Sequence, residues 1–161
     1  MRGFEKISYK QFKKDFKNMK DILKKYKSLK KPVRATKCSA GYDFFAPFDI
    51  VLNPGESIKI PTGIKAYFGP DEMLMLLNKS SIGFKYNIRL LNQVGIIESD
   101  YYNNIDNEGH MWVAIKNEGE KVFKVNQGEK YFQGIFVKFL ICDDDNEERE
   151  RKGGIGSTGK E

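Results

Sequence analysis

Near the start of the chain, apolar residues recur at helical spacing. From Ser8 onward they follow each other in steps of three or four residues, at Phe12, Phe16, Met19, Leu23 and Tyr26. This spacing puts them on one face of a helix, and lysine dominates the opposite face. Ser8 and Gln11 have capping-box spacing, and Pro32 disfavours helix at Lys31. The pattern predicts one amphipathic helix that begins at Ser8 and ends before Pro32.

After Pro32 the pattern changes to short apolar runs rich in Ile, Val, Phe and Tyr. Helical periodicity is absent there, and turn signals separate the runs at residues 53–55, 69–71, 117–119 and 126–128. Many short strands at this spacing favour an antiparallel barrel or sandwich over an α/β fold. Residues 143–161 are charged and then rich in glycine, which is typical of a tail without fixed structure.

Composition narrows the class of protein. The chain has 161 residues, of which 40% are hydrophobic, so one compact domain is expected. No run of eighteen apolar residues occurs, and the first ten residues lack the apolar stretch of a signal peptide. These features predict a soluble cytoplasmic protein with no membrane partner.

Cysteine and histidine are too rare for several kinds of site. Cys38 and Cys142 are the only cysteines and lack CxxC spacing, so neither a disulfide framework nor a cysteine-based zinc site is indicated. His110 is the only histidine, which excludes multi-histidine metal sites. We expect a structural or surface role for His110.

The positive charge is concentrated in one segment. Residues 1–37 carry fourteen Lys/Arg and three Asp/Glu, net +11, whereas residues 38–161 carry fourteen and nineteen, net −5. A basic arm can contact nucleic acid, but a solvated helix face that aids solubility is the simpler interpretation. We therefore do not expect nucleic acid as a partner.

The C-terminal segment combines glycine with hydroxyl side chains. Gly154, Gly156 and Gly159 form a GxGxxG pattern, but no helix can follow in the two remaining residues, so a Rossmann fingerprint is excluded. The P-loop pattern GxxxxGK[ST] is absent. Backbone N–H groups, two hydroxyls and nearby arginines such as Arg151 suit a chain of phosphates. Taken alone, the composition still favours a disordered tail.

Two internal segments also combine groups that suit a nucleotide. Residues 78–83 place amide and hydroxyl side chains after an apolar run, where they could bind phosphate or form an ordinary turn. Residues 92–101 bring a glycine, two carboxylates and a tyrosine together. A carboxylate can deprotonate water and a tyrosine can stack on a sugar or base, although a surface strand has the same composition.

The order of five motifs resembles the trimeric dUTP pyrophosphatase (dUTPase) family. The motifs are AGYDF at residues 40–44, KSSIG at 79–83, GIIESDY at 95–101, GEKYFQGI at 128–135 and RKGGIGSTG at 151–159. Each motif is modest by itself, but five in order over residues 35–159 are specific. The N-terminal helix lies outside the resemblance.

The resemblance implies an all-β fold, a jelly-roll-like β-barrel assembled as a threefold homotrimer. Together with the pattern above, it divides the chain into a basic helical extension (residues 1–32), a β-barrel (33–142) and a C-terminal arm (143–161). Each active site would be drawn from three subunits, and the arm would close over a site on a neighbour.

The implied reaction is hydrolysis of dUTP to dUMP and pyrophosphate, by attack of water on the α-phosphorus. Such an activity limits uracil in DNA and supplies dUMP. Mg²⁺ would be the cofactor, held by the three phosphates and water rather than directly by the protein. Asp43 would act at most indirectly, by orienting groups around the metal.

The resemblance also implies a role for each motif residue. Asn92 and the backbone of Gly95, Ile96 and Ile97 would read the edge of uracil. Tyr101 would pack against the deoxyribose and exclude a 2′-hydroxyl.

The arm and the other motifs would hold the rest of the substrate. Ile155 would cover the base by apolar contact. The residues expected around the phosphates are Lys79, Ser80, Ser81, Gln133, Arg151, Gly156, Ser157 and Thr158.

The match departs from the family at several positions. Glu98 stands where the family has the aspartate that activates water, so the carboxylate reaches further by one methylene group. Lys79 replaces an arginine and loses its bidentate fork. Ile155 replaces a phenylalanine, and residues 102–108 form a longer polar loop than the family's short turn.

Three other interpretations stay open at this stage. The chain could be a regulator that binds dUTP but turns it over slowly because of Glu98. It could belong to the related dCTP deaminase branch, which the close fit of motifs three and five disfavours. The basic arm could also make it a nucleic-acid-binding module.

Overall fold

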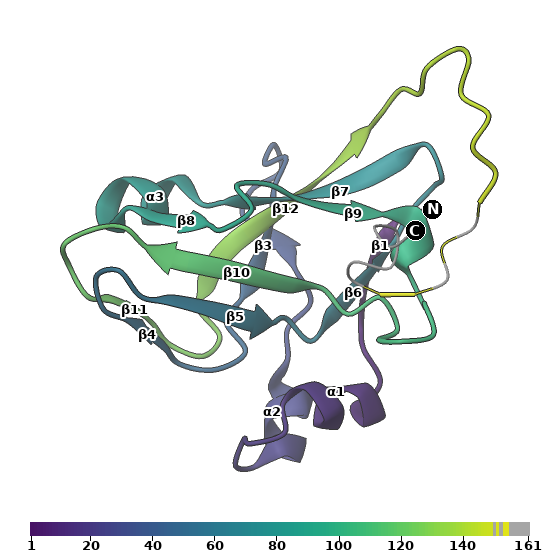
Figure 1. Cartoon of the computed structure of the whole chain (residues 1–161). Coiled ribbons are helices and arrows are strands. Elements are labelled where there is room, and N and C mark those ends of the chain that lie inside the picture. Colours follow the sequence, from purple (N-terminus) through teal and green to yellow (C-terminus); the bar gives the residue numbers. More distant parts are fainter. Residues whose placement is uncertain (150, 152, 155–161) are drawn as a thin grey trace.

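Antiparallel strands make up most of the chain. The computed structural model describes residues 1–149, 151, 153 and 154 (Figure 1). Its strands are β1 (Gly3–Lys6), β2 (Val33–Arg34), β3 (Tyr42–Phe45), β4 (Ile50–Leu52), β5 (Ser57–Pro61), β6 (Ile64–Tyr67), β7 (Glu72–Asn78), β8 (Ile88–Leu90), β9 (Gly95–Glu98), β10 (Trp112–Asn117), β11 (Phe123–Val125) and β12 (Lys130–Lys138). Its helices are α1 (Tyr9–Asp15), α2 (Ile22–Ser28), α3 (Ser80–Tyr86) and the 3₁₀-helix η1 (Ser99–Tyr101). Within this described part, no helix is long and apolar enough to cross a membrane.

The largest sheet has the strand order β2-β3-β12-β7-β9. Smaller sheets pair β5-β10-β8, β1-β6 and β11-β4, and every pair is antiparallel. Side chains alternate along the strands, so Leu74 and Leu76 of β7 point into the core while Met73 and Met75 are less buried. The sequence prediction of a mainly β fold is therefore confirmed.

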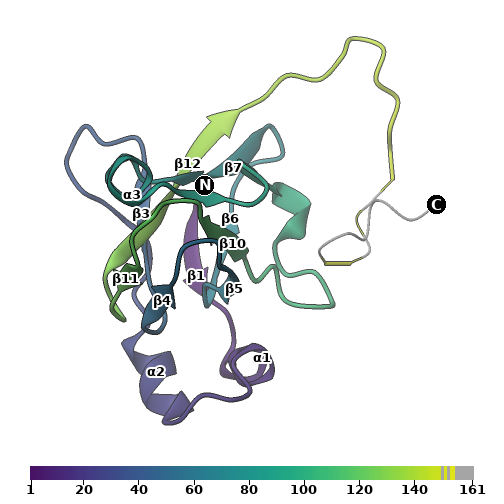
Figure 2. The same cartoon turned by 60° about the vertical axis from the view of Figure 1, so that its left-hand side comes forward.

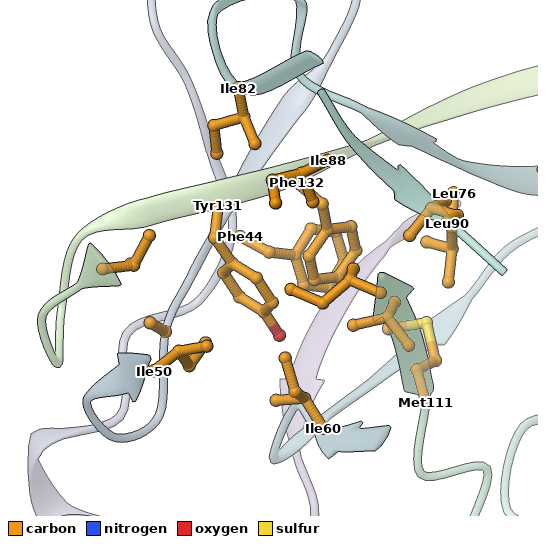
Figure 3. Close-up of a cluster of buried hydrophobic side chains, with 14 of the residues drawn as sticks. Phe44, Ile50, Ile60, Leu76, Ile82, Ile88, Leu90, Met111, Tyr131 and Phe132 are labelled. Atoms are coloured by element: carbon orange, nitrogen blue, oxygen red, sulfur yellow. The ribbon is translucent and has the colours of Figure 1, made fainter. Parts of the chain in front are cut away.

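Aromatic rings fill the centre of the core. Phe44 of β3 and Phe132 of β12 stack with ring centroids 4.3 Å apart, and both are almost fully buried (Figure 3). Ile60 of β5, Leu90 of β8 and Met111, which precedes β10, close the same cluster (Figure 3). Because the two rings come from adjacent strands of one sheet, their packing fixes β3 against β12 and positions the residues that follow on both strands.

Three of the four predicted turns lie wholly between strands, and the fourth begins at Asn117, the last residue of β10. Gly55 and Gly128 adopt φ values of +84°, a left-handed conformation that favours glycine. The amide of Glu56 donates to the carbonyl of Asn53 at 3.1 Å, and that of Glu129 donates to Asn126 at 3.0 Å. The turn signals therefore gave the ends of these strands to within one residue.

The prediction of one N-terminal helix is wrong. The chain leaves the helix at Phe16 and starts α2 after Asp21, which is left-handed at φ 54°, so α1 and α2 lie side by side (Figure 2). A continuous helix would separate Phe12 from Tyr26 by about 21 Å. The break lets their rings meet at 5.3 Å in one cluster, while Leu23, predicted on the apolar face, is 48% exposed.

The N-terminal segment also contains a strand that the sequence pattern did not predict. Strand β1 pairs with β6 over four residues, from Gly3 opposite Tyr67 to Lys6 opposite Ile64. Phe4 of β1 is buried against Tyr42, Phe44 and Phe136. The first residues are therefore part of the folded core, and only the two helices are added to it.

Candidate active site

A carboxylate between two lysines lies where three motifs meet. Asp43 of β3 is 3% exposed and forms ion pairs with Lys79, which precedes α3, and with Lys130 of β12, whose Nζ lies 2.8 Å from Oδ2. Burial acts to raise the pKa of Asp43, but the hydrogen bonds from Lys130 and Lys79 outweigh it and the pKa is lowered. Asp43 is therefore ionised near neutral pH and neutralises part of the local positive charge.

Gln133 lies beside this cluster. It is opposite Asp43 in the β12–β3 pairing, and its Nε2 donates to the carbonyl of Asn78 at 3.0 Å. Gly41 leaves room for that side chain, since a Cβ there would lie 2.2 Å from Oε1 of Gln133. Ser80 and Ser81, at the start of α3, are both exposed. The structure thus brings together Asp43, Lys79, Gln133 and the segment with the two serines.

The Asp43 cluster predicts a dependence of stability on pH. Because its folded-state pKa is lowered, the stability it contributes is present above the ordinary carboxyl pKa, about 4, and is lost as pH falls through the folded-state value. We expect Asp43→Asn to lower the unfolding free energy by about 1–3 kcal/mol at pH 7. The difference from wild type should shrink toward pH 3 in urea titrations. A constant difference from pH 7 to pH 3 would contradict the ion-pair assignment.

The segment expected to read uracil forms an edge of the large sheet. Strand β9 pairs with β7, so Gly95 lies opposite Leu76 and Glu98 opposite Met73. A Cβ on Gly95 would lie 3.1 Å from that of Leu76, so the glycine leaves room for the Leu76 side chain. Asn92 and Gly95 line a cavity of about 310 Å³. Its other lining residues are Lys59, Leu76, Leu90, Leu91, Trp112, Val113 and Ala114.

Glu98, the expected base, is paired with an arginine of the C-terminal arm. Its side chain is 56% exposed and forms an ion pair with Arg151. Nε of the same arginine lies 2.9 Å from Oδ1 of Asp100, and its guanidinium lies over the ring of Tyr101, 5.6 Å from the centroid. The exposed carboxylate is thus within reach of a ligand, and the arm is already in contact with it.

Tyr101 is fixed by its hydroxyl group. The hydroxyl donates to the carbonyl of His110 at 3.0 Å and accepts from Nδ2 of Asn107 at 2.8 Å. The residue is 5% exposed, and burial raises its pKa. Its ring is therefore held in one orientation beside Glu98.

The polar loop after Tyr101 is ordered by its own asparagines. Oδ1 of Asn104 accepts from the amides of Asp106 and Asn107, and Nδ2 of Asn104 donates to the carbonyl of Tyr101. Gly109 has φ +79°, and a Cβ there would lie 2.6 Å from the same carbonyl. Oδ2 of Asp106 accepts from the amide of Gly154 at 2.8 Å. The loop therefore contacts the arm as well as the expected sugar site.

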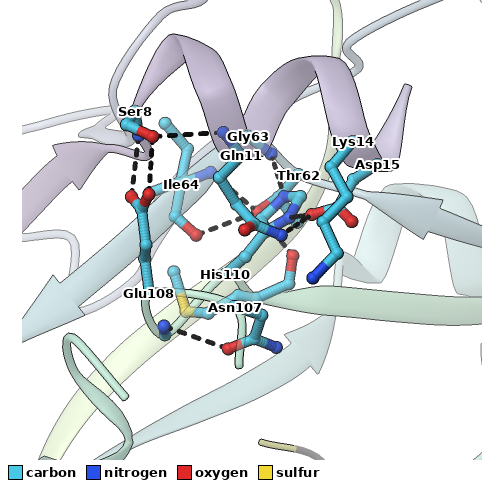
Figure 4. A network of polar contacts seen from close by, with 12 residues as sticks. Ser8, Gln11, Lys14, Asp15, Thr62, Gly63, Ile64, Asn107, Glu108 and His110 are labelled. Atoms are coloured by element: carbon cyan, nitrogen blue, oxygen red, sulfur yellow. Dashed lines mark hydrogen bonds and ion pairs between the residues drawn. The ribbon is translucent and has the colours of Figure 1, made fainter. Parts of the chain in front are cut away.

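His110 has the structural role that its isolation in the sequence indicated. It is completely buried, its Nδ1 donates to Asp15 of α1 at 2.6 Å, and its Nε2 accepts from the amide of Gly63 at 2.8 Å (Figure 4). Burial lowers its pKa although Asp15 acts to raise it. Sequence analysis missed Asp15, because no local pattern connects residues so far apart in the chain.

Two groups of candidate site residues lie at opposite ends of β7: Glu98 with Tyr101 and Arg151, and the Asp43 cluster with Lys79 and Gln133. Glu98 is opposite Met73, whereas Gln133 is opposite Leu77, which is four residues or about 13 Å further along the strand. One chain therefore does not bring Glu98 and Lys79 together. Arg151, Gly153 and Gly154 lie against their own chain, while Ile155, Gly156, Ser157 and Thr158 are outside the described residues.

The two groups combine, in an all-β fold, side chains that suit an enzyme acting on a phosphorylated substrate. An exposed carboxylate beside an arginine can activate water, and lysines with exposed hydroxyls can hold phosphate. The family model for dUTPase matches residues 27–159. The chain belongs to the dUTPase family.

Relatives and solved structures agree with this assignment. The deoxyuridine 5′-triphosphate nucleotidohydrolase of Lactococcus lactis is 44% identical over 143 residues, which cover 86% of this chain and 95% of the relative. The corresponding protein of Paraburkholderia xenovorans is 37% identical over 137 residues, covering 80% and 88%. The crystal structure of dUTPase from Streptococcus mutans matches with a TM-score of 0.68 at 35% identity, covering 88% of this chain and 98% of that one.

A more distant structure shares the fold alone. The dUTPase of Staphylococcus bacteriophage 80alpha, solved with dUpNHpp, matches with a TM-score of 0.63 at 19% identity over 99% of both chains.

Proposed function

We propose that this chain hydrolyses dUTP to dUMP and pyrophosphate. The observation that carries the proposal is the exposed carboxylate of Glu98, held at the end of β9 beside the fixed ring of Tyr101. Both residues lie in the third dUTPase motif, and relatives that align over most of the chain are deoxyuridine 5′-triphosphate nucleotidohydrolases.

The uracil end of the substrate would bind along β9. Backbone groups of Gly95, Ile96 and Ile97 and the amide of Asn92 supply donors and acceptors that match uracil and mismatch the amine of cytosine. Asn92 and Gly95 both line the cavity beside β9, which supports this placement. Tyr101, which its hydroxyl partners hold in place, would pack against the deoxyribose and leave no space for a 2′-hydroxyl.

The phosphate end would bind at the Asp43 cluster and under the arm. Lys79 supplies a positive charge there, and the exposed hydroxyls of Ser80 and Ser81 face solvent beside it. Gln133 adds an amide from β12. The arm residues expected to complete this end are Arg151, Gly156, Ser157 and Thr158, with Ile155 over the base.

Glu98 would accept a proton from the water that attacks the α-phosphorus, and pyrophosphate would leave on the opposite side. Mg²⁺ bound to the substrate's phosphates would offset the charge that develops on them. Asp43 forms ion pairs with Lys79 and Lys130, so it would orient these two lysines and not bind the metal.

The activity is tested by pyrophosphate release from dUTP, dTTP, dCTP and UTP with Mg²⁺. A clear preference for dUTP is expected. Ammonia release from dCTP would instead support a deaminase, and tight binding of dUTP without turnover would support a regulator.

We further propose that the active form is a homotrimer with shared sites. Two observations support it: the 13 Å separation of the two groups along β7, estimated from about 3.3 Å per strand residue, and the exposure of the apolar residues Leu140 and Ile141 after β12. Sedimentation equilibrium should therefore give about three times the chain mass of 18.6 kDa. A fully active monomer would contradict this architecture.

A further inference from the structure

Helix α1 and its N-cap Ser8 contact the loop that follows Tyr101 at three separate positions. Figure 4 shows two of them, between Ser8 and Glu108 and between Asp15 and His110. This loop, residues 102–110, supplies both hydrogen-bond partners of the Tyr101 hydroxyl. It also supplies Asp106, which accepts from the amide of Gly154 in the arm. The helix is therefore connected to two parts of the proposed site without lying in it.

The first contact is buried and directional. Oδ2 of Asp15 accepts from Nδ1 of His110 at 2.6 Å and from Nε2 of Gln11 at 2.7 Å. The histidine ring is completely buried, so removal of the Asp15 carboxylate takes this acceptor away from a buried N–H group. Because the carbonyl of the same histidine holds the Tyr101 hydroxyl, movement of His110 is passed directly to that ring.

The second and third contacts lie on the solvent side of the loop. The carboxylate of Glu108 accepts from the amide of Ser8 at 2.8 Å and from its hydroxyl at 2.5 Å. Ser8 also caps α1, since its Oγ accepts from the amide of Gln11. Nζ of Lys14 donates to the carbonyl of Asp106 at 3.0 Å. The start and the end of α1 are thus both tied to the loop.

We propose that α1 is a positioning element of the active site, which acts through His110 and Glu108 to hold the ring of Tyr101 against the deoxyribose. This inference rests on the proposed function. It assigns a task to the N-terminal segment, for which the sequence motifs gave none. Without the contacts from α1, the ring of Tyr101 could tilt to admit a 2′-hydroxyl. Helix α1 would therefore contribute to discrimination between dUTP and UTP.

The main test is the substitution Asp15→Ala, with Asp15→Asn as the conservative variant. We expect Asp15→Ala to lower the preference for dUTP over UTP, measured as the ratio of kcat/KM values, roughly tenfold, since displacements of about 1 Å have effects of this size or larger. Asparagine keeps an oxygen that accepts from Nδ1 of His110, so Asp15→Asn should restore most of the preference. A loss of stability alone would lower both kcat/KM values equally and leave the ratio unchanged.

Tyr26→Phe provides a matched control. Its hydroxyl donates to the carbonyl of Ile7 at 2.9 Å and so also anchors the N-terminal segment, but it does not contact the loop. It should leave the preference unchanged. Glu108→Ala is a second test variant that keeps His110 paired, and it should lower the preference in the same direction if Asp15→Ala folds poorly.

The outcomes distinguish the positioning role of α1 from the proposed hydrolysis of dUTP. Binding of non-hydrolysable imido analogues of dUTP and UTP is measured beside turnover for every variant. Unchanged preference in both Asp15→Ala and Glu108→Ala, with an active wild type, would overturn the positioning role alone. A wild type that neither binds the dUTP analogue nor releases pyrophosphate would overturn the proposed function and the positioning role with it.

Discussion

Replacement of Glu98 by glutamine is expected to lower kcat for dUTP about 10²- to 10⁴-fold, the usual contribution of a general base. Glutamine keeps the shape of the side chain and can still accept a hydrogen bond from Arg151, but it cannot take a proton from water. The Kd of dUTP should change little, because Glu98 is not expected to contact the base or the sugar. Pyrophosphate release and calorimetric binding measure the two quantities separately.

Asp100→Asn is the matched control for this substitution. Asp100 forms the other ion pair of Arg151, so its loss disturbs the same arginine without removing the proposed base. It should have a much smaller effect on kcat. Full activity in Glu98→Gln would show that Glu98 does not act as the base.

The substitution Glu98→Asp tests whether the longer glutamate side chain lowers the rate of hydrolysis. A rate increase of roughly ten- to a hundredfold would mean that the native glutamate holds its carboxylate in the wrong place. An equal or lower rate would mean that the surroundings fit glutamate. The polar loop at residues 102–108, which is tied to Tyr101 by hydrogen bonds, would be the part of these surroundings that accommodates the longer side chain.

The sequence predicted the strand-rich part of the fold well, because that information is local. Turn signals such as residues 53–55 and 126–128 lie between strands as expected. The alternation in β7 marks the residues that face the core. Turn signals and alternating burial depend only on residues that are neighbours along the chain. The period of two in a strand can therefore be read directly from the sequence.

The N-terminal segment could not be predicted in the same way. Phe12, Phe16 and Tyr26 have helical spacing whether the helix is continuous or broken, so periodicity did not reveal the break near Asp21. The strand β1 is only four residues long, and its pairing with β6 joins segments far apart in sequence. Both features depend on tertiary packing, which local propensity does not encode.

The candidate site was predicted from motif order more than from chemistry. Lys79 and Gln133 lie in one cluster with Asp43, but their predicted role in binding phosphate stays a prediction. The ion pairs that Arg151 forms with Glu98 and Asp100 were not predicted. A single sequence contains no signal that pairs charged residues more than fifty positions apart, so only the folded chain reveals these ion pairs.

Removal of residues 153–161 is expected to lower kcat/KM for dUTP on the order of a hundredfold or more. This segment holds the glycines and hydroxyls expected to surround the phosphates, and loss of even one preorganised donor costs about 10²-fold. The core should stay folded, since the buried cluster around Phe44 and Phe132 lies in earlier strands. Thermal unfolding and sedimentation should therefore match wild type, while pyrophosphate release falls.

Mixed assemblies decide whether the arm acts on its own chain or on a neighbour. Arg151 contacts Glu98 of the same chain here, whereas the proposed trimer has the arm close over another subunit's site. Glu98→Gln chains coexpressed with chains lacking residues 153–161 would form some sites in which an intact Glu98 meets an intact arm from the other chain. Part of the wild-type activity should then return, although each chain alone is nearly inactive. If the arm acts within its own chain, every site in the mixture lacks either the base or the arm, and mixing restores nothing.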